Sequence, residues 1–186
     1  MYYVVHVHAG DETKAEEMIR RVVPEACYTR CFHPKKEMQR KIRGERKPVW
    51  ERMLPGYIFI ETEDPTTLYK ALHRVHIFHR MLGKEGEGDS QYFQPLAGED
   101  LKWLNQIHAL AEDAAVKVTR VKVSKDPDTG ENAVMILEGP LQNFTGTITD
   151  YDLHSRKAKI NVEFMGATTE IHLGIEILGE KESTDA

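Results

Sequence analysis

Apolar residues follow two different patterns along this chain. In the first part, runs of β-branched and aromatic residues alternate with stretches of helical period, and residues 2–7 open the series as a predicted strand. The next stretch carries an apolar helical stripe, made by Ala15, Met18, Ile19, Val22 and Val23. Asp11 is a favourable N-cap before this stripe and Pro24 cannot continue it, so the pattern predicts a helix between them.

The same alternation continues to residue 115. Three further segments have the composition of strands: 26–33, 54–61 and 75–82. A second helix is predicted to start at Asp64-Pro65, because aspartate caps helices and proline suits their first turn. A third helix is predicted after Gly98, on the stripe Leu101, Leu104 and Ile107. The order β-α-β-β-α-β-α predicts an α+β domain over 1–115, with a small antiparallel sheet flanked by helices.

The pattern then changes, and no helical period is found again. Residues 116–132 predict a linker with a turn and at most a short strand. From residue 133 to 180, short apolar runs are separated by glycine-containing turns, which predicts a small all-β barrel. The polar tail 181–186 is predicted to be disordered.

One strand in the first part is apolar on both faces. It follows a Pro-Gly turn, and alternation places Tyr57 and Phe59 on one face and Ile58 and Ile60 on the other. Such a strand needs cover on both faces, and the helices of the same domain can cover one. We therefore predict that part of the second face stays open for a helical partner, with an ordinary core as the alternative.

Charge is distributed unevenly along the chain. The net charge is −5, but residues 34–52 hold eight Lys/Arg and three Glu, so this basic segment carries +5 and the remainder −10. A basic patch on an acidic body is typical of a local contact with a polyanion. We predict an irregular, charged segment with that function, and a solvated loop is the alternative.

Other chemistry has little support in the sequence. The chain has two cysteines, Cys27 and Cys31, and a zinc site would need a second pair of ligands. We therefore predict that both are buried free thiols, in a reducing cytoplasm. We predict that the histidines at 73, 76 and 79 have a structural role or stack on RNA, and that they do not form a metal site. Neither a phosphate-binding glycine loop nor a nucleophile motif is present, so we expect no enzyme, cofactor or metal. No apolar run is long enough for a membrane helix, and we expect a monomer without membrane contact.

Several motifs in register across the chain resemble the NusG family of transcription elongation factors. In the first part they are Tyr3-Val4-Val5, Gly10 and the sequence Leu-Pro-Gly-Tyr-Ile-Phe at 54–59. The second part resembles a KOW motif at 137–141, 144–148, 156–160 and 164–166. The basic residues 41–47 and the barrel segments 139–141, 152–158 and 173–177 are most similar to the specialised LoaP branch of this family.

This resemblance implies an RNP-like NGN domain over 1–115 and an SH3-like KOW barrel over 133–180. It implies an elongation and antitermination factor that binds the β′ clamp helices of RNA polymerase and a hairpin in nascent leader RNA, with other elongation factors as further candidate partners. The alternative is a general NusG-type factor whose barrel recruits Rho or a ribosomal protein without sequence-specific RNA binding. A ribosomal RNA-binding module is a third alternative.

Two sets of residues are candidates for these contacts, and each has a plainer alternative. Four aromatic residues are predicted to contact polymerase, or else to be core: Tyr3, Tyr57, Phe59 and Phe78. The basic residues predicted to contact RNA, or else to be solvated surface, are Arg20, Arg21, Lys35, Lys36, Arg40, Lys41, Arg43, Arg46, Lys47, Arg74, His154, Arg156, Lys157 and Lys159.

Overall fold

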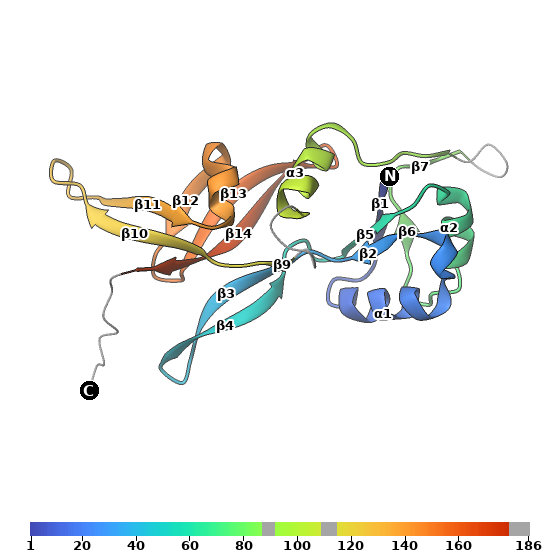
Figure 1. Cartoon of the computed structure of the whole chain (residues 1–186), viewed down its shortest axis with the longest axis horizontal. Coiled ribbons are helices and arrows are strands. Elements are labelled where there is room, and N and C mark those ends of the chain that lie inside the picture. Colours follow the sequence, from blue (N-terminus) through green and yellow to red (C-terminus); the bar gives the residue numbers. More distant parts are fainter. Residues whose placement is uncertain (87–91, 109–114, 179–186) are drawn as a thin grey trace. The chain divides into compact units, whose positions relative to one another are not determined.

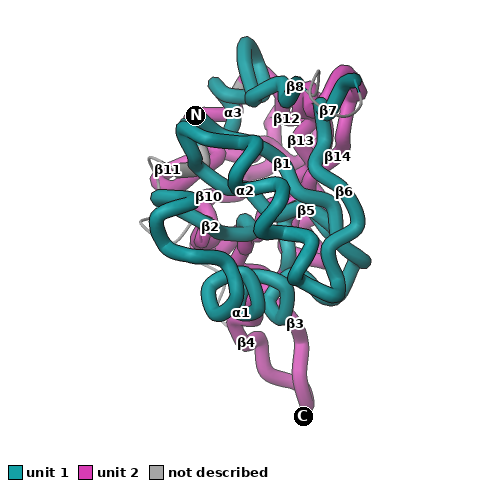
Figure 2. The backbone as a smooth tube through the Cα atoms, turned by 90° about the vertical axis from the view of Figure 1, so that its right-hand side faces the viewer, with its two compact units in different colours: residues 1–34, 52–114 teal, residues 35–51, 115–186 magenta. Residues whose placement is uncertain are grey.

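The computed structural model describes residues 1–86, 92–108 and 115–178. The chain forms two compact units, one from residues 1–34 and 52–114, the other from residues 35–51 and 115–186 (Figure 2). The second unit therefore takes a segment from within the first part of the sequence, and that segment is the basic one.

The first unit contains a four-stranded antiparallel sheet (Figure 1). Its strands, in sheet order, are β2 (Arg30–Phe32), β5 (Tyr57–Glu61), β1 (Tyr2–His6) and β6 (Arg80–Met81). The helices of this unit are α1 (Glu12–Val22), the short η1 (Glu25–Cys27), α2 (Pro65–Leu72) and α3 (Gly98–His108). A small two-stranded sheet joins β7 (Lys84–Glu85) and β8 (Tyr92–Phe93).

The predicted strands and helices of this unit are confirmed in order, with differences at their ends. The second helix starts as predicted, because the Asp64 carboxylate accepts a hydrogen bond from the Thr67 N–H at 3.0 Å. The strand predicted over 75–82 is reduced to β6, and 75–79 forms turns. Residues 84 and 85 form β7, and residues 87–91 lie outside the described residues.

The two faces of β5 are both buried. Antiparallel register pairs Tyr3 with Ile60 and Val5 with Ile58, and this face packs on apolar residues of α1 and α2. On the other face, Phe59 stacks on Phe32, with ring centroids 5.7 Å apart, and its ring lies 6.3 Å from that of Trp103 in α3. The third helix thus covers part of the face that the sequence predicted to be open.

The basic segment is a β-hairpin, so the prediction of an irregular segment was wrong. Its strands are β3 (Lys35–Ile42) and β4 (Glu45–Arg52), neighbours in one sheet. Arg43 and Gly44 have φ of 53° and 88°, the two positive values of a type I′ turn. A two-residue turn at these positions pairs each residue i of β3 with residue 87 − i of β4. The bond from the Met53 N–H to the Pro34 carbonyl, 2.9 Å long, continues this register beyond the strands.

The second unit is built on a five-stranded sheet of order β11-β10-β14-β13-β12. The elements of the unit after the hairpin are β9 (Ala115–Val116), β10 (Thr119–Lys125), β11 (Asn132–Glu138), the 3₁₀ segment η3 (Pro140–Thr147), β12 (Ile148–Asp152), β13 (Lys157–Phe164) and β14 (Ala167–Ile177). On β13, alternate residues from Ala158 to Phe164 are buried and the residues between them are more exposed. The strand β10 lies inside the range predicted as a linker, and it pairs with both β11 and β14. The tail 181–186 lies outside the described residues.

The hairpin packs directly on the strands of this unit. Strand β3 pairs with β9 in parallel and contacts β14. A Cβ atom added at Gly174 would lie 2.3 Å from the Glu37 carbonyl oxygen, so only glycine allows the two backbones this approach. The basic hairpin and the C-terminal strands are therefore one structural unit.

Candidate nucleic-acid interface

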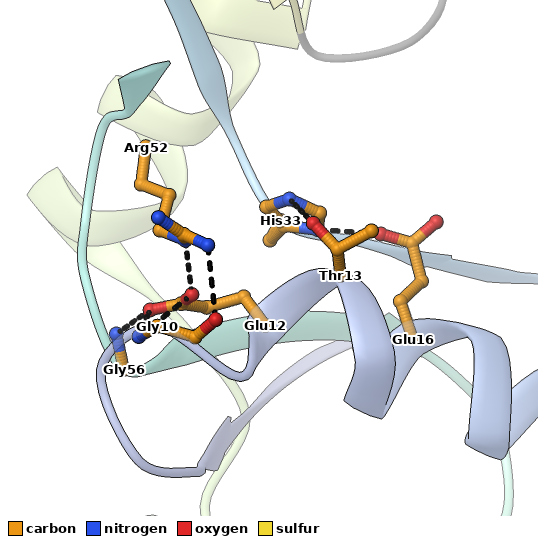
Figure 3. Close-up of polar contacts among 7 residues, drawn as sticks. All are labelled: Gly10, Glu12, Thr13, Glu16, His33, Arg52 and Gly56. Carbon is orange, nitrogen blue, oxygen red and sulfur yellow. Dashed lines mark hydrogen bonds and ion pairs between the residues drawn. The ribbon is translucent and has the colours of Figure 1, made fainter. Parts of the chain in front are cut away.

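A buried carboxylate holds together the backbone at the exit of the hairpin (Figure 3). Glu12 is fully buried and accepts hydrogen bonds from the N–H groups of Gly10, at 3.0 Å, and Gly56, at 2.6 Å. Arg52, the last residue of β4, forms an ion pair with Glu12 and donates to the Gly10 carbonyl at 2.9 Å. Asp11 is the N-cap residue as predicted, but its side chain makes no capping bond. Glu12 instead ties the start of α1 to the Pro-Gly turn.

A second polar group holds the residues that lead into the hairpin (Figure 3). The His33 Nδ1 lies 2.6 Å from a Glu16 oxygen, and its Nε2 lies 3.3 Å from the Thr13 hydroxyl. Arg20 pairs with the other Glu16 oxygen at 2.7 Å and donates to the Cys31 carbonyl at 3.0 Å. Arg20 therefore has an intramolecular role that neither the predicted RNA contact nor the solvated-surface alternative included.

Both carboxylates are held in the ionised form. Burial alone would raise the pKa of Glu12, but the N–H groups of Gly10 and Gly56 and the Arg52 guanidinium outweigh it and the pKa is lowered. Burial is likewise the largest influence on Glu16, and His33 and Arg20 outweigh it to lower that pKa. The two ends of the hairpin are thus fixed by charged groups that stay ionised at neutral pH.

The two faces of the hairpin differ in charge pairing. By the register above, one face carries Lys36, Arg40 and Lys47 together with Glu45 and Glu51. Arg40 pairs with Glu51 at 2.5 Å and Lys47 pairs with Glu45 at 3.1 Å, while Lys36 is buried. The opposite face carries Lys35, Lys41 and Arg46, and none of these has a carboxylate partner among the described residues. Arg43, in the turn, also has none among them.

Hydrogen bonds join the hairpin to the rest of the second unit. Arg46 donates to the His154 carbonyl at 3.0 Å, and the Glu37 carboxylate accepts from the Val118 N–H at 3.2 Å. The pKa of Lys36 is lowered, chiefly by burial and also by the positive charges of Arg40 and Lys157. Since Arg46 bonds to a neutral carbonyl, its positive charge is not compensated by this contact.

The basic residues of the turn between β12 and β13 are partly neutralised. Lys157 lies 3.7 Å from Asp152 and Lys159 lies 3.1 Å from Asp150. His154 is exposed at the turn, and Arg156 follows with φ of 55°. The structure thus brings the predicted basic residues of the hairpin and those of this turn into one unit, while the remaining three, Arg20, Arg21 and Arg74, belong to the first unit.

The third basic group belongs to the first unit. It comprises Arg20, described above, with Arg21 and Arg74, both of which have exposed side chains.

The four aromatic residues predicted to contact polymerase lie in different environments. Tyr3 and Phe59 are 2% and 0% exposed, so both have the core position that was the alternative for them. Tyr57 and Phe78 are half-buried, and Tyr57 contacts the His6 ring at 5.6 Å. The half-buried pair are the members of the set that a partner can reach.

Two features of these surfaces were missed in the sequence. The first is a group of imidazoles near Tyr57, in which His79 lies 5.8 Å from His6 and 4.0 Å from His8, between ring centroids. The second is Trp50 on β4, whose side chain is 51% exposed. An exposed tryptophan inside a basic segment was the available signal for the second feature. No local pattern marks the first.

The predicted free thiols are confirmed. Cys27 and Cys31 are free and buried, and burial raises the pKa of Cys31 to about 12, so its thiol is unreactive at neutral pH. Across residues 1–86, 92–108 and 115–178, no three His, Cys, Asp or Glu side chains are arranged to hold a metal ion. Within the same ranges, no helix is both long and apolar enough to cross a membrane.

Comparison with known proteins places this arrangement in a family. The family model described as "Transcription termination factor nusG" matches residues 1–103, more than half of the chain. The chain belongs to the NusG family. The members that this chain matches are described as transcription termination and antitermination proteins.

NusG proteins of known sequence align with nearly the whole chain. "Transcription termination/antitermination protein NusG" of Halalkalibacterium halodurans is 28% identical over 180 residues, covering 92% of this chain and 93% of that protein. The protein of the same description from Bacillus subtilis is 27% identical over the same length, with the same coverage. Among solved structures, "Domain interaction in Thermotoga maritima NusG" matches 93% of this chain and 92% of that one, at 22% identity and a TM-score of 0.47. The elements of this chain themselves form a mixed α/β arrangement, with few helices and extensive sheets.

Proposed function

We propose that this NusG-family chain is an antitermination factor of the LoaP type, which binds RNA polymerase and a hairpin in the nascent leader RNA. The observation that carries the RNA part is the hairpin β3–β4, with Lys35, Lys41, Arg43 and Arg46 free of carboxylate partners among the described residues. Uncompensated cations on a rigid ribbon favour phosphate contacts, and arginine also suits base edges. In this proposal residues 1–115 are the NGN domain and residues 133–180 the KOW domain, acting in the cytoplasm.

The RNA contact is expected to depend steeply on salt. Each phosphate neutralised lowers the logarithm of the affinity by about 0.7–0.9 per logarithmic unit of salt. If the four unpaired cations of β3–β4 each bind a phosphate, the logarithm of the affinity for a hairpin RNA should fall by about 3 per logarithmic unit of salt. Fluorescence anisotropy over a salt series measures this slope. A flat salt profile would contradict the proposal, because it would leave the basic hairpin without a role in binding.

The polymerase contact is assigned to the half-buried aromatic residues of the first unit. Replacing Tyr57 with Ala should weaken binding to core polymerase by about tenfold, since truncated aromatic anchors commonly cost over 1 kcal/mol. The affinity for RNA should be unchanged. The matched control is Tyr92→Ala, which removes a tyrosine that is 59% exposed on β8. If Tyr57→Ala unfolds the protein instead, as judged by circular dichroism, Tyr57 belongs to the core.

A second candidate function is favoured by the edge strand β11. This strand is outermost in the five-stranded sheet, and its Met135 and Leu137 are 62% and 41% exposed. Apolar edges of this kind suit a protein partner. A general NusG-type factor would use such an edge to recruit Rho or a ribosomal protein. In that case Met135→Ser should abolish recruitment, and the RNA affinity should be low and independent of sequence.

A further inference from the structure

Trp50 is a large apolar side chain in an unusual place. It is 51% exposed and lies on β4, the edge strand of the sheet β4-β3-β9, while the chain's other tryptophan, Trp103, is 4% exposed. Burying a tryptophan ring contributes a large free energy, so an exposed ring is able to contribute strongly to binding a flat ligand. Its surroundings therefore indicate what it binds.

The face of β4 that carries Trp50 combines flat apolar groups with cations that have no carboxylate partner among the described residues. Alternation places Arg46 and Pro48 on the same face of the strand. The hairpin register sets Lys41 across from Arg46 and Glu37 across from Trp50. The Glu37 carboxylate is engaged by the Val118 N–H, and Lys41 has no carboxylate partner among the described residues. Glu37 keeps its negative charge, since its partner is a neutral N–H, but Lys35, Lys41 and Arg46 leave the face that carries the ring with a net positive charge.

The chain also gives this face a fixed conformation. The hairpin closes through a tight turn at Arg43 and Gly44, and its register continues to the Pro34–Met53 hydrogen bond. The edge position of β4 accommodates Pro48, which has no N–H to donate. An aromatic ring beside cations on a surface strand is the arrangement by which proteins hold single-stranded nucleic acid.

We propose that Trp50 is a stacking platform for an unpaired nucleotide, with Lys41 and Arg46 binding the phosphates next to that nucleotide. This rests on the proposed function, and it specifies that the hairpin reads an unpaired position, such as a loop or bulge, rather than the paired stem. Every base has a π-face, so stacking by itself tolerates any base at that position. A regular A-form stem offers no free base face, and it would leave the tryptophan ring uncovered.

Fluorescence gives a direct test in the full-length chain. In Trp103→Phe, Trp50 is the sole tryptophan, and it should be quenched on titration with a single-stranded oligoadenylate RNA. Blunt duplex RNA should bind through phosphates without this quenching. A DNA oligonucleotide of the same sequence tests whether the sugar matters, and equal quenching would assign the site to single strands of either kind. Saturated binding of single strands with no change in Trp50 emission would overturn the proposal.

Affinity measurements provide the second arm. Trp50→Ala should lower the affinity for the oligoadenylate by about tenfold, which is typical when an aromatic residue that stacks on a base is replaced by alanine. Trp50→Phe should retain most of the affinity. The control Tyr92→Ala removes an exposed aromatic ring elsewhere and should change nothing. An unchanged affinity in Trp50→Ala, or a loss of polymerase binding with oligonucleotide affinity retained, would overturn the assignment. If RNA binding is steeply salt-dependent but unaffected by changes at Trp50, only the role of Trp50 is contradicted. If the chain binds no RNA at all, the proposed function is contradicted as well.

Discussion

Replacing Glu12 with Gln is expected to lower the free energy of unfolding by about 2–3 kcal/mol. The carboxylate is fully buried and holds the N–H groups of Gly10 and Gly56 and the guanidinium of Arg52. Glutamine keeps the shape but removes the charge and offers a single acceptor oxygen where both carboxylate oxygens are used. Arg52 is 44% exposed and can turn to water, which keeps the expected loss below the roughly 3–5 kcal/mol typical of a fully buried pair. Urea denaturation measures the change.

The control for this variant is Glu17→Gln, an exposed glutamate on the same helix that makes no such contacts. The pH dependence gives an independent check. Because the folded pKa of Glu12 is lowered, its ionised form stabilises the fold at neutral pH, and that contribution is lost as the pH falls through the folded pKa. Glu12→Gln should therefore lose stability at neutral pH and show a weaker decline in acid. Equal stability of the two variants at neutral pH would show that the group is not important for the fold.

Removing three hairpin cations together is expected to have the largest effect on RNA binding. The triple variant Lys41→Gln, Arg43→Gln and Arg46→Gln takes away charges that no described carboxylate compensates. Affinity for a hairpin RNA should fall on the order of a hundredfold at moderate salt, and the salt slope should decrease by about 2–3. The same anisotropy series measures both quantities.

The control removes the same charge from elsewhere. Lys70, Lys122 and Lys125 are exposed lysines outside the predicted contact set, and their triple Gln variant changes the net charge equally. A general electrostatic attraction to the chain predicts that both triple variants weaken binding alike. A local contact at the hairpin predicts that only the first does so, and equal losses would contradict it.

The elements with a strong apolar period were predictable from the sequence. The first helix, with five apolar residues in one stripe, and β5, apolar on both faces, appear where the pattern predicted them. The covered second face of β5 was not predictable, because Trp103 was absent from the apolar stripe assigned to the third helix. Its contact with Phe59 joins residues far apart in sequence.

The hairpin shows why a highly charged strand is difficult to predict from its sequence. Its two strands of eight residues carry mostly charged side chains, and Met38 is the one apolar residue of β3 that is buried. The buried face of β3 carries Lys36 beside Met38, so burial alternates along the strand while apolar and polar residues do not. The close approach of Gly174 to the Glu37 carbonyl is a tertiary contact, and no local pattern encodes it. For the same reason the sequence could name the basic residues and could not say that the hairpin joins the C-terminal strands.

One measurement tests the central proposal most directly. The affinity of the full-length chain is compared for a leader hairpin from a neighbouring operon and for a scrambled hairpin of the same length, in the same salt. The proposed LoaP-type function, with unpaired cations and Trp50 on the hairpin β3–β4, predicts tight binding of the native hairpin and at least tenfold weaker binding of the scrambled one. Weak and equal binding of both would contradict it and would favour a general NusG-type factor.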